Sequence, residues 1–353
     1  MKTPNTASRI LQVLVATLLF LFSASLAWGV MLDYQSRGIV SKGVTVAGHD
    51  LSGMTEAQVR ATIKEAVSAP MLRPVTVTGD KKTWTLDPKG IVTIDADSMI
   101  NAAYSPKRTA TLLERLNSQL TGQPLPADIK PVYSVHSAAI AAWVARTATK
   151  VDRKPVDATR KLAGYAFKIT PSAYGAKVDR TNAVARISKA LSAETALSSA
   201  DRVVTLPVGL PKPNVVQSSF KAAIVVSLSQ CRIRLYDGAK LIKSYSCAPG
   251  QPAWPTPTGD FKIDSKLADA PWINPHDSWS ASMPDVIPGG PDNPMGDRKI
   301  GINYAGVFMH GVPPGEFGSI GTQASHGCMR MMPSAVHDLY GRVHIGNPVF
   351  IRD

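Results

Sequence analysis

The segment Ser325-His-Gly-Cys-Met-Arg330 (SHGCMR), near the end of the chain, places a cysteine beside a histidine and a glycine. A second histidine, His310, lies 15 positions before Ser325, in the stretch Phe308-Met-His-Gly311. A cysteine reacts as a nucleophile only as its thiolate, and an adjacent histidine is the usual group that takes the proton. The pattern leaves three alternatives for Cys328: a nucleophile, a metal ligand or a buried structural thiol.

Two histidines are candidate partners of the thiol. His326 lies two residues before Cys328, so in an extended segment it projects to the same side, whereas His310 approaches only through folding. The amides of Gly327 and Cys328 are candidate oxyanion donors for an acyl-transfer intermediate. Arg330 offers a fork of donors that suits a substrate carboxylate.

Zinc is the sharpest alternative to a nucleophile. His310, His326 and Cys328 would supply three ligands, and a further histidine the fourth: His276, His337 or His344. The chain has no paired short spacing such as C-x-x-C or H-E-x-x-H, which disfavours zinc. A lone cysteine in a β-rich domain is most often a small buried hydrophobic residue. Spacing alone therefore puts acyl transfer ahead of its alternatives without deciding between them.

The N-terminus indicates the compartment. Ile10 to Leu32 is a run of 23 residues without a charge, where about 20 suffice to cross a bilayer. Lys2 and Arg9 precede the run, so the short N-terminal end is expected in the cytoplasm and the rest outside it. A cleaved signal peptide is the alternative, with Ser25-Leu-Ala27 as the cleavage site. Because the uncharged run continues past that site, we expect an uncleaved single-pass membrane anchor.

Positive charge is concentrated in the first part of the chain. Of 353 residues, 39 are Lys or Arg and 26 are Asp or Glu, giving +13. From Asn214 onward 12 basic residues face 11 acidic ones, so 27 basic and 15 acidic residues fall before it. Nucleic acid suits such a surface, but an anionic cell wall or membrane suits it equally. The extracytoplasmic compartment favours the wall and membrane, and we expect no nucleic-acid partner.

The chain has three cysteines: Cys231, Cys247 and Cys328. The stretch from Cys231 to Cys247 reads as a β-hairpin whose turn is Asp237-Gly238. With a three-residue loop the two cysteines would face each other across the strands. A disulfide there is plausible outside the cytoplasm, and side-by-side burial as free thiols stays open. If they pair, Cys328 is the unpaired, reactive thiol.

The regions between these features differ in the secondary structure that their sequences predict. Before the Pro-rich stretch Pro207–Pro213 the pattern alternates helices and strands. It includes a capping box at Thr55–Gln58 and a helix marked by Leu112, Leu113, Leu116 and Leu120 that Gly122 closes. The similar order of elements in its two halves suggests a duplicated α+β unit. The boundaries we expect are 1–9 cytoplasmic tail, 10–32 anchor, 33–206 α+β binding or spacer domain, 207–220 linker and 221–353 catalytic domain.

Beyond the linker the sequence is β-rich. It includes one long segment rich in Pro, Gly and Asn, from Pro271 to Gly296, that also carries Trp272 and Trp279. Long loops inside a compact domain usually carry function. We expect this loop to form a lid or a groove wall that contacts substrate through its tryptophans.

At this point a resemblance becomes specific. His310, then 14 intervening residues, then SHGCMR is similar to the signature of the L,D-transpeptidase catalytic domain. Further stretches fit in the same order: Val225-Val-Ser-Leu-Ser-Gln230, Tyr236-Asp-Gly238, Pro255-Thr-Pro-Thr-Gly-Asp-Phe261 and Gly346-Asn-Pro-Val349. The likeness covers about residues 221–353. Asp50-Leu-Ser-Gly-Met-Thr55 more loosely resembles the peptidoglycan-binding domains that often precede this catalytic domain.

The resemblance implies a mainly-β sandwich with Cys328 as nucleophile, His310 as proton donor and acceptor, and His326 as a residue that shapes the site. Ser325 and Arg330 would contact substrate, although the family has either Asn or Arg at the position of Arg330. The implied substrate is a peptidoglycan tetrapeptide stem, attacked at its third residue with release of D-alanine. A neighbouring stem would then resolve the thioester, giving a 3→3 cross-link. No metal, ATP or other cofactor is implied.

The same candidate residues would also serve other functions. Water as acceptor would make an L,D-carboxypeptidase, and a protein amine would make a protein–wall ligase. A catalytically inactive wall-binding protein is the alternative of a different class, which the intact set from His310 to Cys328 disfavours. The remaining alternative function is a thiol protease that acts on all-L peptides.

Overall fold

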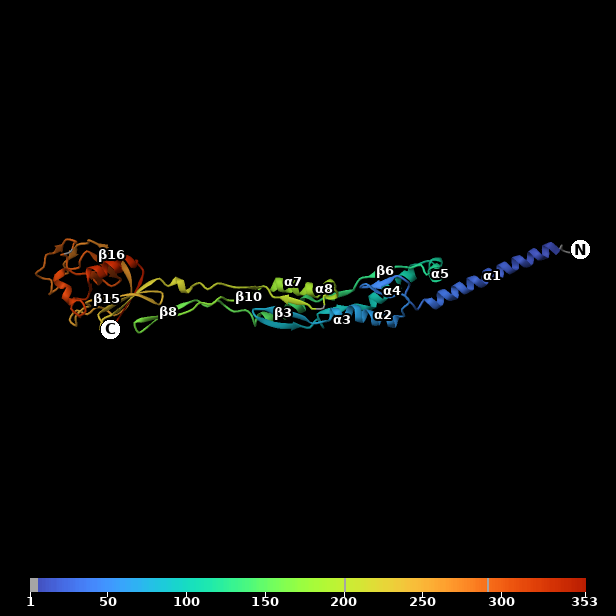
Figure 1. The fold of residues 1–353 in the computed structure, drawn as a ribbon, viewed down its shortest axis with the longest axis horizontal. Helices are drawn as coiled ribbons and strands as arrows, with labels where there is room; N and C mark the ends of the chain where they lie inside the picture. The colour runs from blue at the N-terminus through green and yellow to red at the C-terminus, as the bar shows by residue number, and fades with distance from the viewer. Residues whose placement is uncertain (1–5, 200, 291) are drawn as a thin grey trace. The chain divides into compact units, whose positions relative to one another are not determined.

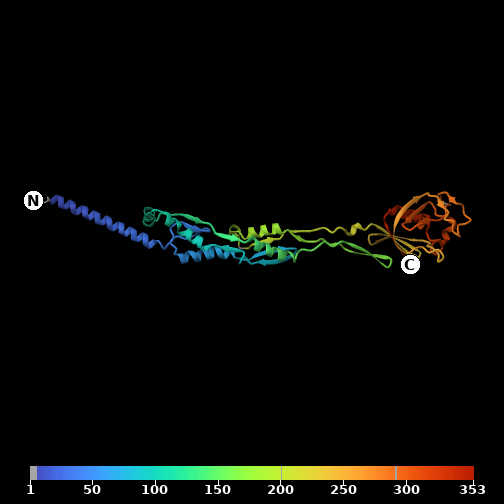
Figure 2. The same ribbon diagram turned by 180° about the vertical axis from the view of Figure 1, so that it is seen from behind.

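The computed structural model describes residues 6–199, 201–290 and 292–353. The chain divides into two compact units. The first comprises Met1–Arg153 and Ala176–Leu210, and the second Lys154–Gly175 and Pro211–Asp353. Figures 1 and 2 show the chain from opposite sides, coloured from blue at the N-terminus to red at the C-terminus.

One continuous helix, α1 (Thr6–Ser36), forms the N-terminal part of the first unit (Figure 1). Its segment Ala7–Ser36 has a mean hydropathy of 2.3 and is long and apolar enough to cross a membrane. Large side chains such as Phe20 and Trp28 are exposed along it, as lipid contact requires. A signal sequence near the N-terminus can meet the same criteria of length and hydropathy, so the helix alone does not separate an anchor from a leader.

The rest of the first unit mixes helices with short strands. The helices are α2 (Glu56–Ile63), η1 (Lys64–Ser68), α3 (Ala69–Met71), α4 (Ala96–Thr109), α5 (Leu112–Thr121), α6 (Ser137–Ala148), α7 (Arg180–Ala190) and α8 (Ala193–Ser198). The strands are β1 (Val44–Val46), β2 (His49–Asp50), β3 (Val75–Gly79), β4 (Lys82–Leu86), β5 (Val92–Ile94), β6 (Ala127–Ile129), β7 (Tyr133–Val135), β10 (Lys177–Val178), β11 (Val203–Thr205) and β12 (Val208–Gly209).

Several helix ends form where the sequence predicts them. The Thr55 amide donates to the Gln58 side chain (2.9 Å) at the start of α2. Thr111 and Glu114 form a second capping box at the start of α5. Gly122 ends α5 with φ +76°, in the left-handed region that favours glycine at this position.

The two halves of this unit share one hydrophobic core. β11 pairs in parallel with β3, which is more than 120 residues earlier in the chain, and β3 pairs with β4. Buried residues from Val40 to Leu206 form a single cluster. The unit is therefore an α+β domain in which the early and late segments complete each other.

The second unit is mainly β. Its strands are β8 (Thr159–Ala163), β9 (Ala166–Thr170), β13 (Ala222–Ser227), β14 (Arg232–Asp237), β15 (Lys240–Ser246), β16 (Gly259–Ala268), β17 (Trp272–Ile273), β18 (Val286–Ile287), β19 (Arg298–Ile302), β20 (Phe308–Gly311), β21 (Met329–Met331) and β22 (Pro348–Arg352). Its helical segments are η2 (Gln217–Ser219), η3 (Pro314–Ser319) and α9 (Pro333–Arg342).

Eight of these strands form one sheet, in the order β15-β14-β13-β22-β16-β19-β20-β21. β16 joins its two halves: Gly259–Lys262 pairs with β22, and Ile263–Ala268 pairs with β19 after a register shift near Ile263. Strands that bend at such irregularities let a sheet fold over on itself. The expected mainly-β fold of this region is confirmed, and β20 and β21, which lie next to the candidate site residues, are at one end of the sheet.

The predicted hairpin forms as β14 and β15, but its loop differs from our expectation. Asp237 pairs with Lys240, leaving a two-residue loop, and a register shift between Leu235 and Tyr236 brings Cys231 opposite Cys247. The Cys247 amide donates to the Cys231 carbonyl (3.0 Å). Both cysteines are nevertheless buried free thiols. The disulfide candidate is corrected to the other alternative, side-by-side thiols, because burial without a bond satisfies both as small hydrophobic residues.

The β8–β9 hairpin falls within the range expected for the α+β domain but packs with the catalytic unit. Phe167 of β9 lies in a small core with Val225 and Tyr236, and the rings of Phe167 and Tyr236 meet edge to face at 5.2 Å. The Tyr236 hydroxyl donates to the Tyr165 carbonyl (2.8 Å). Arg160 also donates to the Lys221 carbonyl (2.8 Å). Residues before the linker therefore help to build the second unit.

Candidate active site

A cavity of about 760 Å³ lies in the second unit, within the size range of ligand pockets, roughly 300–1,000 Å³. Its lining draws on most of the residues that the sequence singled out: Trp272, Trp279, His310, Ser325, His326, Gly327, Cys328 and Arg330. Residues more than 50 positions apart in the sequence therefore meet in one place.

The pairing of β20 with β21 fixes how His310 and Cys328 face the cavity. In this parallel pair Met309 is opposite Met329, and His310 is opposite Arg330. Both methionines are fully buried in the core. Because successive side chains of a strand alternate between faces, His310, Arg330 and Cys328 share the other face. The imidazole on β20 and the thiol of Cys328, which directly precedes β21, therefore both line the cavity.

The environment of His310 sets its tautomer. Its Nδ1 lies 2.6 Å from the carbonyl oxygen of Gly311. A carbonyl can only accept, so Nδ1 carries the proton and Nε2 keeps a free lone pair. His310 is only 4% exposed, and burial lowers its pKa to about 4. The residue is therefore a neutral imidazole at neutral pH, in the form that can accept a proton.

Cys328 is partly exposed at the cavity. Burial of the sulfur raises the pKa of the thiol, while Arg330 and Lys299 act in the opposite direction. Its Sγ donates to the Gly306 carbonyl (3.3 Å). The resting pair is thus a protonated thiol beside a neutral imidazole, and reaction requires a proton transfer between them.

The hydroxyl of Ser325, which we expected to contact substrate, is bonded within its own turn. Ser325 is 1% exposed, its hydroxyl donates to the Cys328 carbonyl (2.5 Å), and it accepts from the Gly327 amide (3.2 Å). Gly327 has φ +106°, which strains any residue with a Cβ. Ser325 therefore holds the turn that presents Cys328. Since its N–H is already bonded, Gly327 is a weaker oxyanion candidate than the sequence suggested.

A residue that the sequence analysis did not select, Thr256, supports the same turn. It is 3% exposed. Its hydroxyl donates to the Gly327 carbonyl (2.9 Å) and accepts from the Gly250 amide (2.8 Å). The Pro255–Phe261 motif was visible in the sequence, but this bond joins segments about 70 residues apart. Only the folded chain reveals which residue of the motif makes it.

His326 lies between two tryptophans. The Trp279 ring stacks on it with centroids 4.3 Å apart and planes 8° apart, and Trp254 meets it edge to face at 4.6 Å. Trp272 lies 6.2 Å from Trp279. The long loop is therefore a wall of the cavity, fixed to the SHGCMR segment through aromatic contacts. Burial also lowers the pKa of His326.

Two cations border the site. Arg330 is paired with Glu316 (2.6 Å), and its side chain is 17% exposed, so part of its donor fork is already occupied. Lys299, which sequence reasoning missed, is 3% exposed and donates to the carbonyls of Ala270 and Pro271 (3.0 and 2.9 Å). Burial lowers the pKa of Lys299, and the nearby Cys328 opposes that shift. Lys299 thereby connects the start of the long loop to the thiol.

The zinc alternative finds no ligand cluster. Within the described ranges 6–199, 201–290 and 292–353, no group of three or more His, Cys, Asp or Glu side chains is placed to hold a metal ion. Of the histidines proposed as a fourth ligand, His337 instead bonds Asp297 through Nε2 (2.8 Å).

Comparison with known proteins gives the same organisation. Residues 221–351 match the family model of the L,D-transpeptidase catalytic domain, and residues 83–196 match a model described as a peptidoglycan binding domain. The chain is 28% identical over 162 residues to the Escherichia coli protein named Probable L,D-transpeptidase YcfS, covering 43% of this chain and 49% of the relative. It is 31% identical over 166 residues to Probable L,D-transpeptidase YbiS of the same organism, covering 44% and 51%.

Among solved structures, the catalytic domain from the E. faecium L,D-transpeptidase is similar, with 25% identity, coverage of 38% of this chain and 98% of that one, and a TM-score of 0.30. The chain spans about half the length of the two curated relatives. The chain carries an L,D-transpeptidase catalytic domain at residues 221–351, preceded by a peptidoglycan-binding domain at residues 83–196.

Proposed function

We propose that this protein is a membrane-anchored peptidoglycan L,D-transpeptidase that forms 3→3 cross-links through a thioester on Cys328. The observation that carries the proposal is that His310 and Cys328 line the same cavity. His310 lies on β20 and Cys328 directly precedes the adjacent strand β21. Nδ1–H of His310 is bonded to a carbonyl, so Nε2 is left to accept the thiol proton.

The first half of the reaction is acylation. The imidazole of His310 takes the thiol proton, and the sulfur of Cys328 attacks the carbonyl carbon of the third residue of a tetrapeptide stem. The Cys328 amide is the candidate donor to the developing oxyanion, since the Gly327 amide is bonded to Ser325. The tetrahedral intermediate then collapses. The bond to D-alanine breaks, its amine receives the proton from His310, and a thioester remains.

The second half is transfer to an acceptor. The side-chain amine of the third residue on a neighbouring stem attacks the thioester carbonyl, and His310 removes its proton. The carbon–sulfur bond breaks and the new amide is the 3→3 cross-link. The proton returns to the sulfur, so the thiol and the neutral imidazole are restored. One amide bond is broken and one is formed, which is why the sequence needs no external source of energy.

The cavity walls suit a peptide substrate. The loop tryptophans Trp272 and Trp279 offer apolar surface, and Arg330, on the same face as His310, offers the N–H groups left over from its pair with Glu316 to a stem carboxylate. These contacts are proposals that follow from position in the lining.

The location of the enzyme belongs to the same proposal. Helix α1 would remain in the membrane as a single-pass anchor, and both units would lie outside the cytoplasm at the cell wall. The excess of basic residues before Asn214 favours contact with anionic wall polymers.

The test uses the full chain in detergent and tetrapeptide muropeptides, with Cys328→Ala as the matched control. Mass spectrometry of the products distinguishes the candidate activities. A dimer lacking one D-alanine, formed by the wild type and not by Cys328→Ala, is the expected result. A monomer shortened by one residue would replace the proposal with an L,D-carboxypeptidase. No product and no acyl adduct would favour a wall-binding protein, and cleavage of an all-L peptide would favour a protease.

A further inference from the structure

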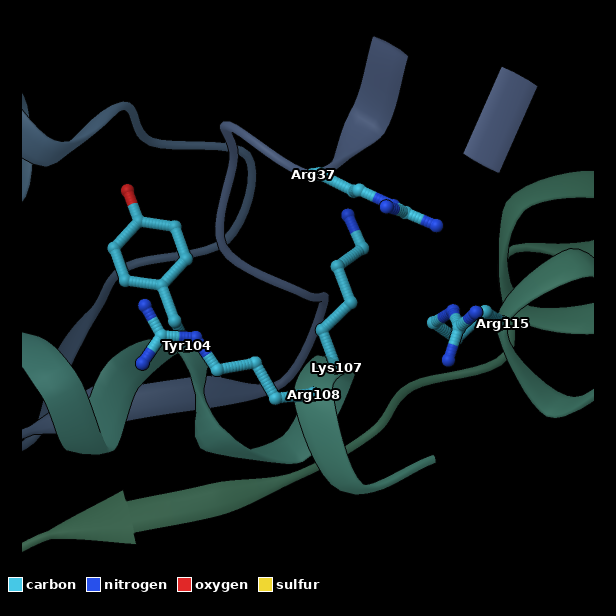
Figure 3. A pocket seen from close by; sticks show the side chains of 5 residues that line it. All are labelled: Arg37, Tyr104, Lys107, Arg108 and Arg115. Atoms are coloured by element: carbon cyan, nitrogen blue, oxygen red, sulfur yellow. The ribbon is translucent and has the colours of Figure 1, made fainter. Parts of the chain in front are cut away.

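A second cavity lies in the first unit, where α1 meets α4 and α5. It has a volume of about 290 Å³ and is lined by Arg37, Tyr104, Lys107, Arg108 and Arg115. Figure 3 shows the Lys107 side chain pointing toward Arg37, with Arg115 entering from α5 and Arg108 beside Tyr104. Four of the five lining side chains are cations, so the cavity attracts anions.

Internal acidic groups only partly balance these charges. Asp33 of α1 is 1% exposed and pairs with both Arg115 (2.7 Å) and Arg37 (3.1 Å). Lys107 donates to two backbone carbonyls, those of Ser36 and Ile39 (2.7 and 3.2 Å). Over residues 6–199, 201–290 and 292–353 neither Lys107 nor Arg108 forms an ion pair. The cavity therefore keeps a surplus of positive charge and suits an anion with several acceptor oxygens.

The position along α1 indicates which anion. The uncharged run from Ile10 to Leu32 is about 34 Å long as an α-helix, close to a hydrocarbon core of about 30 Å. Arg37 lies five residues beyond Leu32, about 7 Å further along the helix direction. Headgroup layers extend roughly 5–8 Å beyond the core on each side. The exposed rings of Trp28 and Tyr34 mark the same boundary, where aromatic residues gather. The cavity thus falls at the level of lipid phosphates.

Helix α5 supports the same placement. Leu116 packs against α1, since a Cβ on Gly29 would lie 3.4 Å from its methyl carbons. Gly29 belongs to the apolar run, so α5 reaches the depth of the hydrocarbon edge. Leu113 and Leu120, at i and i+7 and flanking Leu116, are 79% and 73% exposed. An amphipathic helix with such a face lies in the membrane interface. The Asp33–Arg115 pair holds α5 in this position.

We propose that the cavity lined by Arg37, Lys107, Arg108 and Arg115 binds the phosphate of an anionic lipid headgroup, with the leucine face of α5 embedded in the outer leaflet. The inference rests on the membrane anchoring proposed above. Its consequence is that the first unit is held at the membrane surface at two points, α1 and α5, and is oriented by both.

Native mass spectrometry of the detergent-solubilised full chain, titrated with phosphatidylglycerol or phosphatidylcholine, tests the phosphate site. The wild type is expected to retain phosphatidylglycerol in preference to phosphatidylcholine. The loss of one cation close to an anionic lipid weakens lipid binding roughly fivefold. Lys107→Gln with Arg108→Gln should therefore lower the affinity about 25-fold, and Arg108→Gln alone, which leaves the backbone bonds of Lys107 intact, about fivefold. The charge-matched control is Arg146→Gln with Lys150→Gln, both exposed on or just after α6.

Three results would overturn the inference. The first is equal retention of the two lipids. The second is a loss of phosphatidylglycerol affinity in the control double variant as large as that in Lys107→Gln with Arg108→Gln. The third is displacement of phosphatidylglycerol by millimolar inorganic phosphate. The last would assign the site to free phosphate. Extraction by alkaline carbonate separates this inference from the anchor: if the full chain is extracted from membranes, the anchoring proposal itself fails. If the chain stays in the membrane but shows no lipid preference, only the site is wrong.

The depth of α5 has its own measurement. A dye attached through Leu113→Cys, in a Cys328→Ala background in nanodiscs, is expected to be quenched by brominated lipid. The same dye attached through Ala142→Cys, an exposed position on α6, should not be. Equal quenching at both positions, or none at Leu113, would contradict the interfacial placement.

Discussion

The ring of Trp279 stacks on that of His326, with centroids 4.3 Å apart and an interplanar angle of 8°. This contact joins the middle of the long loop to the residue two positions before the thiol. Together with the edge-to-face contact from Trp254, it fixes the His326 ring in the wall of the cavity. The consequence is that His326 and the loop should respond together to mutation.

Trp279→Ala is expected to raise KM for the stem peptide roughly two- to tenfold, since aromatic pairs contribute about 0.5–1.5 kcal/mol. Because burial is what lowers the pKa of His326, the same change should raise that pKa toward its ordinary value. Titration of the His326 ring by NMR measures the shift. Trp279→Phe is the control: it keeps an aromatic ring, so KM and the pKa of His326 should both stay close to those of the wild type. An unchanged pKa in the alanine variant would show that the stacking seen here does not bury the ring.

Thr256→Val tests the support of the catalytic turn. The change keeps the shape of the side chain but leaves the Gly250 amide and the Gly327 carbonyl without their partner. Unpaired buried groups cost about 1–3 kcal/mol each, so the free energy of unfolding and kcat should both fall. Thr256→Ser retains the hydroxyl and should restore both. Normal activity in the valine variant would mean that the turn is held by Ser325 alone.

The buried imidazole of His310 gives stability a particular pH dependence. Its pKa is lowered from 6.5 to about 4, so the unfolded chain binds a proton at higher pH than the folded one. The free energy of unfolding is therefore largest above pH 6.5 and falls as the pH drops toward 4, by about 3 kcal/mol. Urea unfolding at several pH values measures this. His310→Gln should lack this part of the dependence, and identical profiles in the two proteins would contradict the buried neutral imidazole.

The three cysteines should behave as two classes of thiol. Cys231 and Cys247 are buried, whereas Cys328 is partly exposed at the cavity, so a reagent should reach Cys328 and neither of the other two in the folded protein. Burial also raises the pKa of Cys247 to about 12. A thiol reagent is expected to modify Cys328 alone under native conditions and all three after denaturation. An intact mass lower by two hydrogens, with only one thiol titrated in denaturant, would restore the disulfide between Cys231 and Cys247.

Local features were predictable because nearby residues determine them. The capping box at Thr55 and the helix end at Gly122 formed as the sequence indicated. The β14–β15 hairpin also formed, although with a two-residue loop in place of the expected three. The residues gathered around Cys328 were also identified from their motif and spacing. The role of Ser325 was not, because a hydroxyl that bonds the backbone of its own turn looks the same in sequence as one that faces substrate.

Features that depend on distant segments were missed for a related reason. Thr256 bonds Gly327 about 70 positions away, and Lys299 bonds the start of the long loop. The β8–β9 hairpin joins the catalytic unit through Phe167 and Tyr236, although the proline-rich linker between them suggested a boundary. Pairings of this kind come from three-dimensional packing, which neither periodicity nor turn signals encode.

The most direct test of the central claim is the intact mass of the full chain after mixing with a tetrapeptide stem whose third-residue amine is blocked, so that it cannot act as acceptor. The account predicts an adduct equal to the stem less D-alanine, located on the peptide that contains Cys328, with one D-alanine released per adduct. The adduct should be absent in Cys328→Ala and should form about 10²–10⁴-fold more slowly in His310→Gln. No adduct, or the same adduct in Cys328→Ala, would contradict thioester chemistry at this cysteine.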